Sequence, residues 1–485
     1  MTPPSPVTLV VGAPEGTAEG DNVGTRQIVQ AFEHEGLTVL GRDGRALPQL
    51  AESWAWDSDG RRLRVRVRND VTYHDGTPLT AEGVAVALSD ARDDPGLRLL
   101  YPGLGDVTAI DAGDGGEIVI SLASPNRLLP EELDVPIGKP GTGTGTGPYR
   151  ARPGASGDVV LERHEQYHAG RPAIERLIIR PFSTMRTAWA SLLRGELDVV
   201  DVEPHGLRFA ENASVQRLTA LAPYLYMVAL NNDVPPLDRT EVRRALNLAI
   251  DRDRLVRRVL EDTSQLASDP VWPELWAHDA TLEPFHLDLP TARQLLDRVG
   301  LPVPAAAGAT GRRRSRFTFT ALVPAGIESA ERLALEVQRD LFALDINMQL
   351  ESVPVAEFSG RVQERRFEAV VLSVISGPTI GRPMLFWRAP NRAGGLNVFG
   401  YANDDVERLY AGLRSPVDEQ TFRASVSGLQ RAFRQDPPAI FLGWERRTRL
   451  VNRRFNVSAD RGRDPLYSMW KWTLSAEGTG RNGRE

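Results

Sequence analysis

The chain has 485 residues, more than one hydrophobic core usually organises, so we expect two or three domains. Hydrophobic residues make up 41% and charged residues 25%, which is typical of a folded, water-soluble protein and excludes fibrous and disordered classes. The 64 acidic and 58 basic side chains give a net charge of -6, which argues against nucleic acid as a partner. Cysteine is absent, which excludes disulfides, thiolate metal sites and a lipoprotein attachment residue.

The amino-terminal part indicates alternating strands and helices. Val7–Gly12 is a short apolar run typical of a buried strand, and Thr25–His34 has helical character. In Leu63–Val67, apolar residues alternate with arginine, as in a strand with one solvent-exposed face. Asp59-Gly60, just before this strand, favours a hairpin turn. Thr80 can cap the helix that follows.

The stretch Pro136–Pro148 is rich in proline and glycine, and we interpret it as a crossing between domains. Beyond it the pattern predicts two strands, then a helix ending before Gly195, then a buried strand, at 159–161, 177–180, 184–194 and 198–202. Strands that alternate with helices favour parallel or mixed sheets.

The same alternation continues in the second half. A strand at Tyr224–Asn231 precedes one long helix at Glu241–Val259, with acid at its start and arginine near its end. Pro302–Arg316 is typical of a surface loop. A strand, a helix and another strand follow at 317–322, 329–344 and 347–353.

Two features bear on location. No stretch of about 18 apolar residues occurs, as a membrane-spanning helix would need. Met1–Val11 lacks the basic start and long apolar core of a signal peptide. The sequence as given therefore shows neither a membrane span nor an export signal.

His164, Glu165 and His168 fit the H-E-x-x-H pattern, which in zinc proteases places two histidines on one helix face. Here a strand-like run precedes the motif, and Ala169–Pro172 interrupts it at once. We therefore expect a solvated turn. A zinc hydrolase remains an alternative that metal analysis of the purified protein would settle.

Two further motifs are also explained without a binding role. Gly141–Gly147 offers backbone amides that could cradle phosphate, but it lacks the Lys-Ser/Thr ending of a P-loop, so an interdomain crossing is the better interpretation. Arg312–Arg314 is a basic run of the kind that is usually solvated. We expect no metal and no cofactor.

Ordered blocks along the chain resemble a known family. They are LPQLAESWAWDSDGRRLRVRVRNDVTYHDGTPLTAEGV from Leu47, GTGPYRARPG from Gly145 with LERHEQYHAGRP and RGELDVVDVEP, EVRRALNLAIDRDRLV from Glu241, and the later LDLPTARQLLDRVGL and GYANDDVERLYAGLRSPVDEQ. In this order they are similar to the bacterial extracellular solute-binding proteins of family 5, the oligopeptide-, dipeptide- and nickel-binding components of ABC importers.

The resemblance implies an α/β chain with the type II periplasmic-binding-protein fold: two lobes, with an additional domain on the first. The expected ranges are 1–40, 147–225 and 447–485 for the first lobe, 41–146 for the additional domain, and 226–446 for the second lobe. Crossing strands at 224–231 and 440–449 are expected to bend as the lobes close on a ligand.

The resemblance also implies a function without catalysis. The expected protein is a monomer outside the cytoplasm that captures a small solute between its lobes and delivers it to an ABC permease. A cytoplasmic sensor or regulatory protein with the same fold is the alternative, since no export signal is visible.

Candidate ligand contacts follow from the resemblance and from the residue types that line small-molecule sites. They are Asn22, Tyr226, Val374, Ser376, Gly377, Arg382, Trp387 and Asn397. Peptide-binding relatives typically place a tryptophan, and shortly after it an aspartate that pairs with the peptide's α-ammonium, at the positions of Val374 and Gly377. We therefore expect that ordinary linear peptides are not preferred, unless a shifted alignment brings Glu368 or Asp404 into that role.

Overall fold

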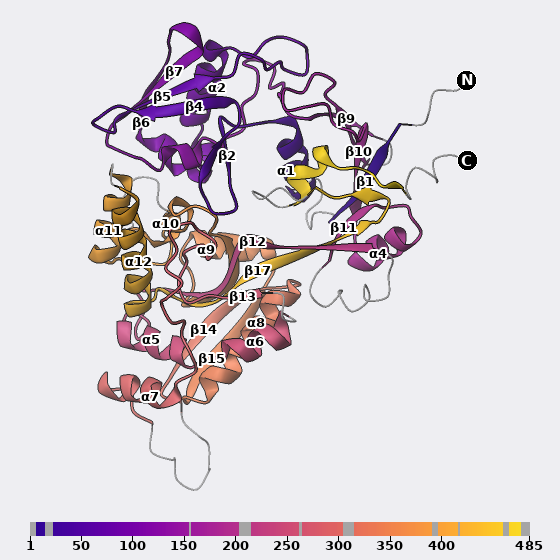
Figure 1. Ribbon diagram of the computed structural model, residues 1–485. Helices are drawn as coiled ribbons and strands as arrows, with labels where there is room; N and C mark the ends of the chain where they lie inside the picture. The colour runs from indigo at the N-terminus through magenta and orange to yellow at the C-terminus, as the bar shows by residue number, and fades with distance from the viewer. Residues whose placement is uncertain are drawn as a thin grey trace. The chain divides into compact units, whose positions relative to one another are not determined.

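The protein is described by a computed structural model that places residues 6–14, 23–154, 157–202, 215–260, 264–303, 315–389, 396–415, 418–458 and 465–476 (Figure 1). It divides into two compact units, residues 1–220 with 447–485 and residues 221–446. The unit boundaries thus lie at 220/221 and 446/447, whereas the lobe boundaries expected from the sequence lie at 225/226 and 446/447.

A mixed sheet forms the centre of the first unit. Its strand order runs from the end of β17 (Ala439–Asn452) through β11 (Val199–Val202), β1 (Thr8–Pro14), β10 (Arg176–Phe182) and β9 (Val159–Arg163) to β8 (Tyr149–Pro153). β1 is parallel to both neighbours, and the other pairs are antiparallel. The helices of this part are α1 (Val23–Glu33) and α4 (Met185–Leu193), and a small ladder joins β18 (Phe455–Asn456) to β19 (Thr473–Leu474).

A second, antiparallel sheet lies within the same unit. Its order is β4 (Ala51–Trp56), β5 (Arg62–Val67), β7 (Glu117–Leu122) and β6 (Val107–Ala112), with α2 (Ala81–Asp93) against β6 and β7, and α3 (Pro95–Leu100), β2 (Thr38–Leu40) and β3 (Ala46–Pro48) nearby in the chain. The alternation of β5 buries every second residue in a core cluster that Trp54 and Trp56 also join. As expected, the Thr80 side chain accepts a hydrogen bond from Gly83 N at 3.1 Å. The additional domain at 41–146 remains a prediction, supported by this separate sheet and core.

The second unit is built on β15 (Ile346–Val353), β14 (Phe317–Pro324), β16 (Ala369–Ile375), β12 (Val215–Leu230) and the start of β17, with β13 (Ser264–Leu266) beside β17. Its helices are α5 (Thr240–Leu248), α6 (Arg252–Val259), α7 (Leu289–Arg298), α8 (Glu328–Phe342), α9 (Val355–Gln363), α10 (Gly381–Trp387), α11 (Asp404–Arg414) and α12 (Glu419–Gln435). The strands β12, β14, β15, β16 and β17 pack with α5, α6, α7 and α8 into one large apolar cluster. β12 and β17 are the two strands in which the unit boundaries fall.

The prediction of one helix over 241–259 is wrong. α5 ends at Leu248 and α6 begins at Arg252, because Asp251 is a helix cap rather than a helical residue. Its side chain accepts from Arg254 N at 3.0 Å, and its own N–H donates to Asp340 Oδ2 at 3.0 Å. The break turns the two helices so that both reach the start of β17.

In the parts of the chain that the structure describes, no helix is both long and apolar enough to cross a membrane.

Candidate ligand-binding site

Four of the predicted contacts come together at one end of β12 and β16. Tyr226 pairs with Ser373 and Leu225 with Val374 across these strands. Ser376 and Gly377 follow directly, and their N–H groups point at Pro223 O at 2.9 and 3.4 Å. Tyr226 is half-buried, while Val374 is buried. All the described candidates lie in the second unit, and Asn22 lies outside the described residues.

The loop after β16 is fixed by an aromatic pair. A Cβ at Gly377 would lie 2.5 Å from a ring carbon of Trp272, which is buried and meets Trp444 edge-on at 5.1 Å between ring centroids. The hydroxyl of Ser376 donates to Pro270 O at 3.1 Å. Position 377 therefore accepts only glycine in this structure, since any side chain would displace the Trp272 ring.

Trp272 lies against the candidate site, and the sequence did not reveal this position. The run VWPELW shows aromatic content but no signal that one ring closes over residue 377, about a hundred positions along the chain.

Trp387 is packed among aromatic side chains. It is 1% exposed, stacks on Phe399 at 5.3 Å, and meets Phe441 and Tyr401 edge-on at 5.9 and 6.3 Å. Such contacts are typical of core packing, so they stabilise this part of the second unit. A ligand contact by Trp387 remains a prediction.

The side-chain amide of Asn397 forms hydrogen bonds with the backbone around it. Its Nδ2 donates to Arg388 O at 2.7 Å and to Tyr401 O at 2.6 Å, and its Oδ1 accepts from Phe399 N at 3.1 Å. These bonds fix the segment after α10. Arg382, half-buried in the first turn of α10, has its N–H directed at Thr379 Oγ1 at 3.4 Å. For both residues a role toward ligand stays a prediction.

The H-E-x-x-H segment forms a turn rather than a helix, and the prediction of a solvated turn holds for Glu165 and Gln166, which are exposed, but is wrong for the side chains of Tyr167 and His168. Tyr167 and His168 are buried against Glu35, whose side chain is 2% exposed. The Tyr167 hydroxyl donates to Glu35 Oε1 at 2.8 Å, His168 Nε2 lies 3.0 Å from the same oxygen, and Thr146 Oγ1 donates to Oε2 at 2.9 Å. These two side chains are buried because they supply polar partners to a carboxyl group inside the fold.

Among the described residues, no three histidine or acidic side chains converge as ligands for a metal ion.

Two glycines of the 141–147 run, Gly145 and Gly147, serve close packing. A Cβ at Gly145 would lie 1.8 Å from Glu33 O, and one at Gly147 would lie 2.2 Å from Phe32 O. Gly147 N donates to Glu33 O at 2.9 Å. The segment thus approaches the carbonyl end of α1, where the electrostatic environment favours donors rather than phosphate. Arg312–Arg314 lies outside the described residues.

Comparison with known proteins places the chain in a class. Residues 45–391 match the profile of the bacterial extracellular solute-binding proteins, family 5 Middle. The chain is 24% identical over 460 residues to the oligopeptide-binding protein AppA of Bacillus subtilis, covering 88% of this chain and 83% of that protein. It is 23% identical over 429 residues to the probable D,D-dipeptide-binding periplasmic protein DdpA of Escherichia coli, covering 81% and 78%.

The fold agrees with this class. The solved structure of NikA from Brucella suis in complex with Fe(III)-EDTA matches with a TM-score of 0.81 at 19% identity, over 96% of this chain and 100% of that one. This likeness confirms the type II periplasmic-binding-protein fold expected from the sequence.

The chain belongs to the bacterial extracellular solute-binding proteins of family 5. It is the substrate-binding component of an ABC importer, and these relatives give no support to the cytoplasmic sensor.

Proposed function

We propose that this chain captures a small solute other than an ordinary linear peptide, outside the cytoplasm and as a monomer, and passes it to an ABC permease without catalysing a reaction. The observation that carries the importer role is the family match over 45–391, joined by relatives aligned over most of their own length. The family's members are binding proteins, which supports the absence of catalysis.

The environment of Gly377 supports the exclusion of linear peptides. By the family resemblance, this is the position where peptide-binding relatives carry the aspartate that pairs with an α-ammonium. Here the Trp272 ring occupies the space of a side chain. An ammonium taken from water into a closed site needs an opposite charge or several acceptors, and leaving it unpaired costs several kcal/mol.

One alternative carboxylate is already engaged. Glu368 Oε2 accepts a hydrogen bond from Thr320 N at 2.7 Å, which ties Glu368 to β14. Without an aspartate at position 377 we expect peptide affinity to be lower by on the order of 100-fold, at about 1.4 kcal/mol per tenfold.

Calorimetry with di- to pentapeptides tests the ligand class. Each peptide is compared with its N-acetylated form, because acetylation removes the ammonium and leaves the rest of the ligand intact. Binding at millimolar strength or weaker, with no effect of acetylation, is expected. Micromolar or tighter binding that depends on the free amino terminus would restore the peptide assignment.

A thermal-shift screen with sugars, metal chelates and peptides tests the importer role itself, because a ligand that binds only the folded state raises the midpoint temperature. Cell fractionation tests the location. Recovery of the protein from the cytosol alone would contradict it.

A further inference from the structure

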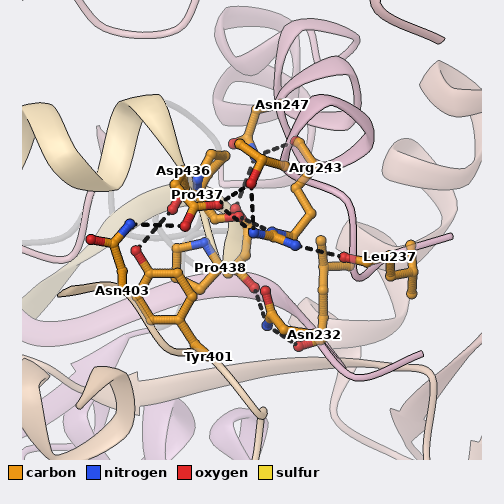
Figure 2. A network of polar contacts seen from close by, with 12 residues as sticks. Asn232, Leu237, Arg243, Asn247, Tyr401, Asn403, Asp436, Pro437 and Pro438 are labelled. Atoms are coloured by element: carbon orange, nitrogen blue, oxygen red, sulfur yellow. Dashed lines mark hydrogen bonds and ion pairs between the residues drawn. The ribbon is translucent and has the colours of Figure 1, made fainter. Parts of the chain in front are cut away.

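The block EVRRALNLAIDRDRLV supplies three side chains that hold the start of β17. Arg243 Nε donates to Pro437 O at 2.9 Å, Asn247 Nδ2 donates to Ala439 O at 2.9 Å, and Arg252 Nε donates to Phe441 O at 2.8 Å. Figure 2 shows the Arg243 guanidinium pointing at the turn that leads into the strand. The donors come from α5 and α6, so the break between these helices lets both reach one strand.

Two more side chains hold the same segment from elsewhere in the second unit (Figure 2). The Tyr401 hydroxyl donates to Asp436 O at 3.0 Å. Asn232 Nδ2 lies 3.3 Å from Pro438 O and 2.8 Å from Leu230 O, which joins the end of β12 to the start of β17. Together, Asn232, Arg243, Asn247, Arg252 and Tyr401 form what we call the carbonyl clamp, which holds the carbonyls of residues 436, 437, 438, 439 and 441.

The clamp contains two buried guanidinium groups. Arg243 forms an ion pair with Asp436, whose other oxygen accepts from Asn403 Nδ2 at 2.9 Å. Arg252 is 3% exposed, and burial lowers its pKa to about 9. Its other donors go to Asn247 O and Asn247 Oδ1, both at 2.8 Å. Removing one partner from such a network would leave buried polar groups unsatisfied, which makes local opening of the clamp costly.

The opposite ends of both strands are anchored in the first unit. β17 pairs with β11 from Thr448 to Val451, and the hydroxyls of Thr219 and Thr448 lie 2.8 Å apart. Gln216 Nε2 donates to Phe455 O at 2.6 Å. These contacts tie each strand to the first unit up to Thr219 and from Thr448 onward.

The anchors of the second unit stop just short of these points. β12 pairs with β16 from Tyr224, and the carbonyl of Pro223 is already bonded to the loop after β16. β17 pairs with β13 as far as Glu445. Residues 220–222 and 446–447 are the stretches that lie between the two sets of anchors.

We propose that the clamp residues are positioning residues for ligand capture. They make the start of β17 and the end of β12 move as part of the second unit, so that bending is confined to 220–222 and 446–447. The expected bending within 440–449 is thereby narrowed to 446–447, whereas the bending expected within 224–231 is moved to 220–222, because residues 224–230 pair with β16. The inference rests on the proposed function, since only a receptor that opens and closes needs a defined pivot.

Pulsed electron paramagnetic resonance on the ligand-free protein tests the proposal. Because the chain has no cysteine, Glu82→Cys on α2 and Arg408→Cys on α11 give two unique, exposed spin-label positions, one in each unit. Arg243→Met removes the guanidinium from the clamp. We expect a broader distribution of label-to-label distances than in the parent, and amide exchange at least about tenfold faster in residues 439–441.

The matched control is Arg316→Met. Arg316 is also a buried guanidinium of the second unit that pairs with an aspartate, Asp297, and a carbonyl, Leu301 O, but it lies at the start of β14. The control should lower thermal stability and leave the distance distribution at the parental width. Asn232→Ala is a milder clamp variant, which keeps the test informative if Arg243→Met fails to fold.

An unchanged width in the clamp variants, or equal broadening in the control, would overturn the proposal. The distance measurement uses no ligand, so it can support the clamp even if the ligand screen finds no solute. A failure of the clamp test would likewise leave the importer role standing.

Discussion

Acid should destabilise this protein through His74, which lies between β5 and α2. Its Nε2 lies 2.9 Å from Gly147 O, and its ring meets that of His164 edge-on at 5.1 Å. Burial lowers the pKa of His74 from 6.5 to about 4; the bond to Gly147 opposes this shift, and His164, His34 and Arg150 add to it. At pH values between these two pKa values, the histidine binds a proton in the unfolded chain but not in the folded protein, so the free energy of unfolding falls as the pH falls.

The size of the effect follows from the two pKa values. A difference of about 2.5 at ~1.4 kcal/mol per unit gives at most roughly 3 kcal/mol lost between pH 6.5 and pH 4. His74→Gln keeps an amide donor for Gly147 O but takes up no proton in this range. Its urea-unfolding midpoint should therefore fall less steeply with acid than that of the parent.

His286→Gln is the control, because the His286 side chain is 65% exposed. It should retain the parental dependence on pH. A parental slope in His74→Gln would refute the assignment of the acid sensitivity to this histidine.

Three further predictions concern single substitutions. Burial, and next to it the charge of Glu132, raises the pKa of Glu131 from 4.5 to about 8. Between these two values the folded protein keeps a proton that the unfolded chain releases, so stability falls as the pH rises toward 8. In urea unfolding, Glu131→Gln should therefore be more stable than the parent at pH 8.5 but not at pH 5. Trp387→Ala should lower the free energy of unfolding by roughly 3–5 kcal/mol, because it leaves a cavity among packed aromatic side chains. An unchanged melting temperature together with lost ligand binding would instead indicate that Trp387 contacts the ligand. Gly145→Ala places a Cβ against Glu33 O and should lower the free energy of unfolding by roughly 1–3 kcal/mol or more. Calorimetric melting can check this against Gly105→Ala, where an added Cβ meets no atom within 4 Å.

Local rules predicted much of the fold. The alternation of β5, the cap at Thr80 and the strands β14 and β15 follow from neighbouring residues, so the sequence alone carries them. The break between α5 and α6 combines a local cap, in which the Asp251 side chain accepts from Arg254 N, with a contact that no local rule predicts, because the N–H of Asp251 donates to Asp340, 89 positions away.

The candidate site was harder to predict for the same reason. Whether Trp387 points into the core depends on Phe441 and Phe399, which no local pattern places beside it. His168 was expected at a solvated turn, but it is buried by a partner 133 positions away, Glu35. The family resemblance located the class of protein, while the individual contacts depend on long-range packing.

Small-angle X-ray scattering tests the central claim most directly, with the protein alone and then saturated with the solute that gives the largest thermal shift. Capture between two lobes predicts a smaller radius of gyration in the saturated sample, because closure compacts the molecule. Identical scattering profiles at saturation would contradict capture by lobe closure.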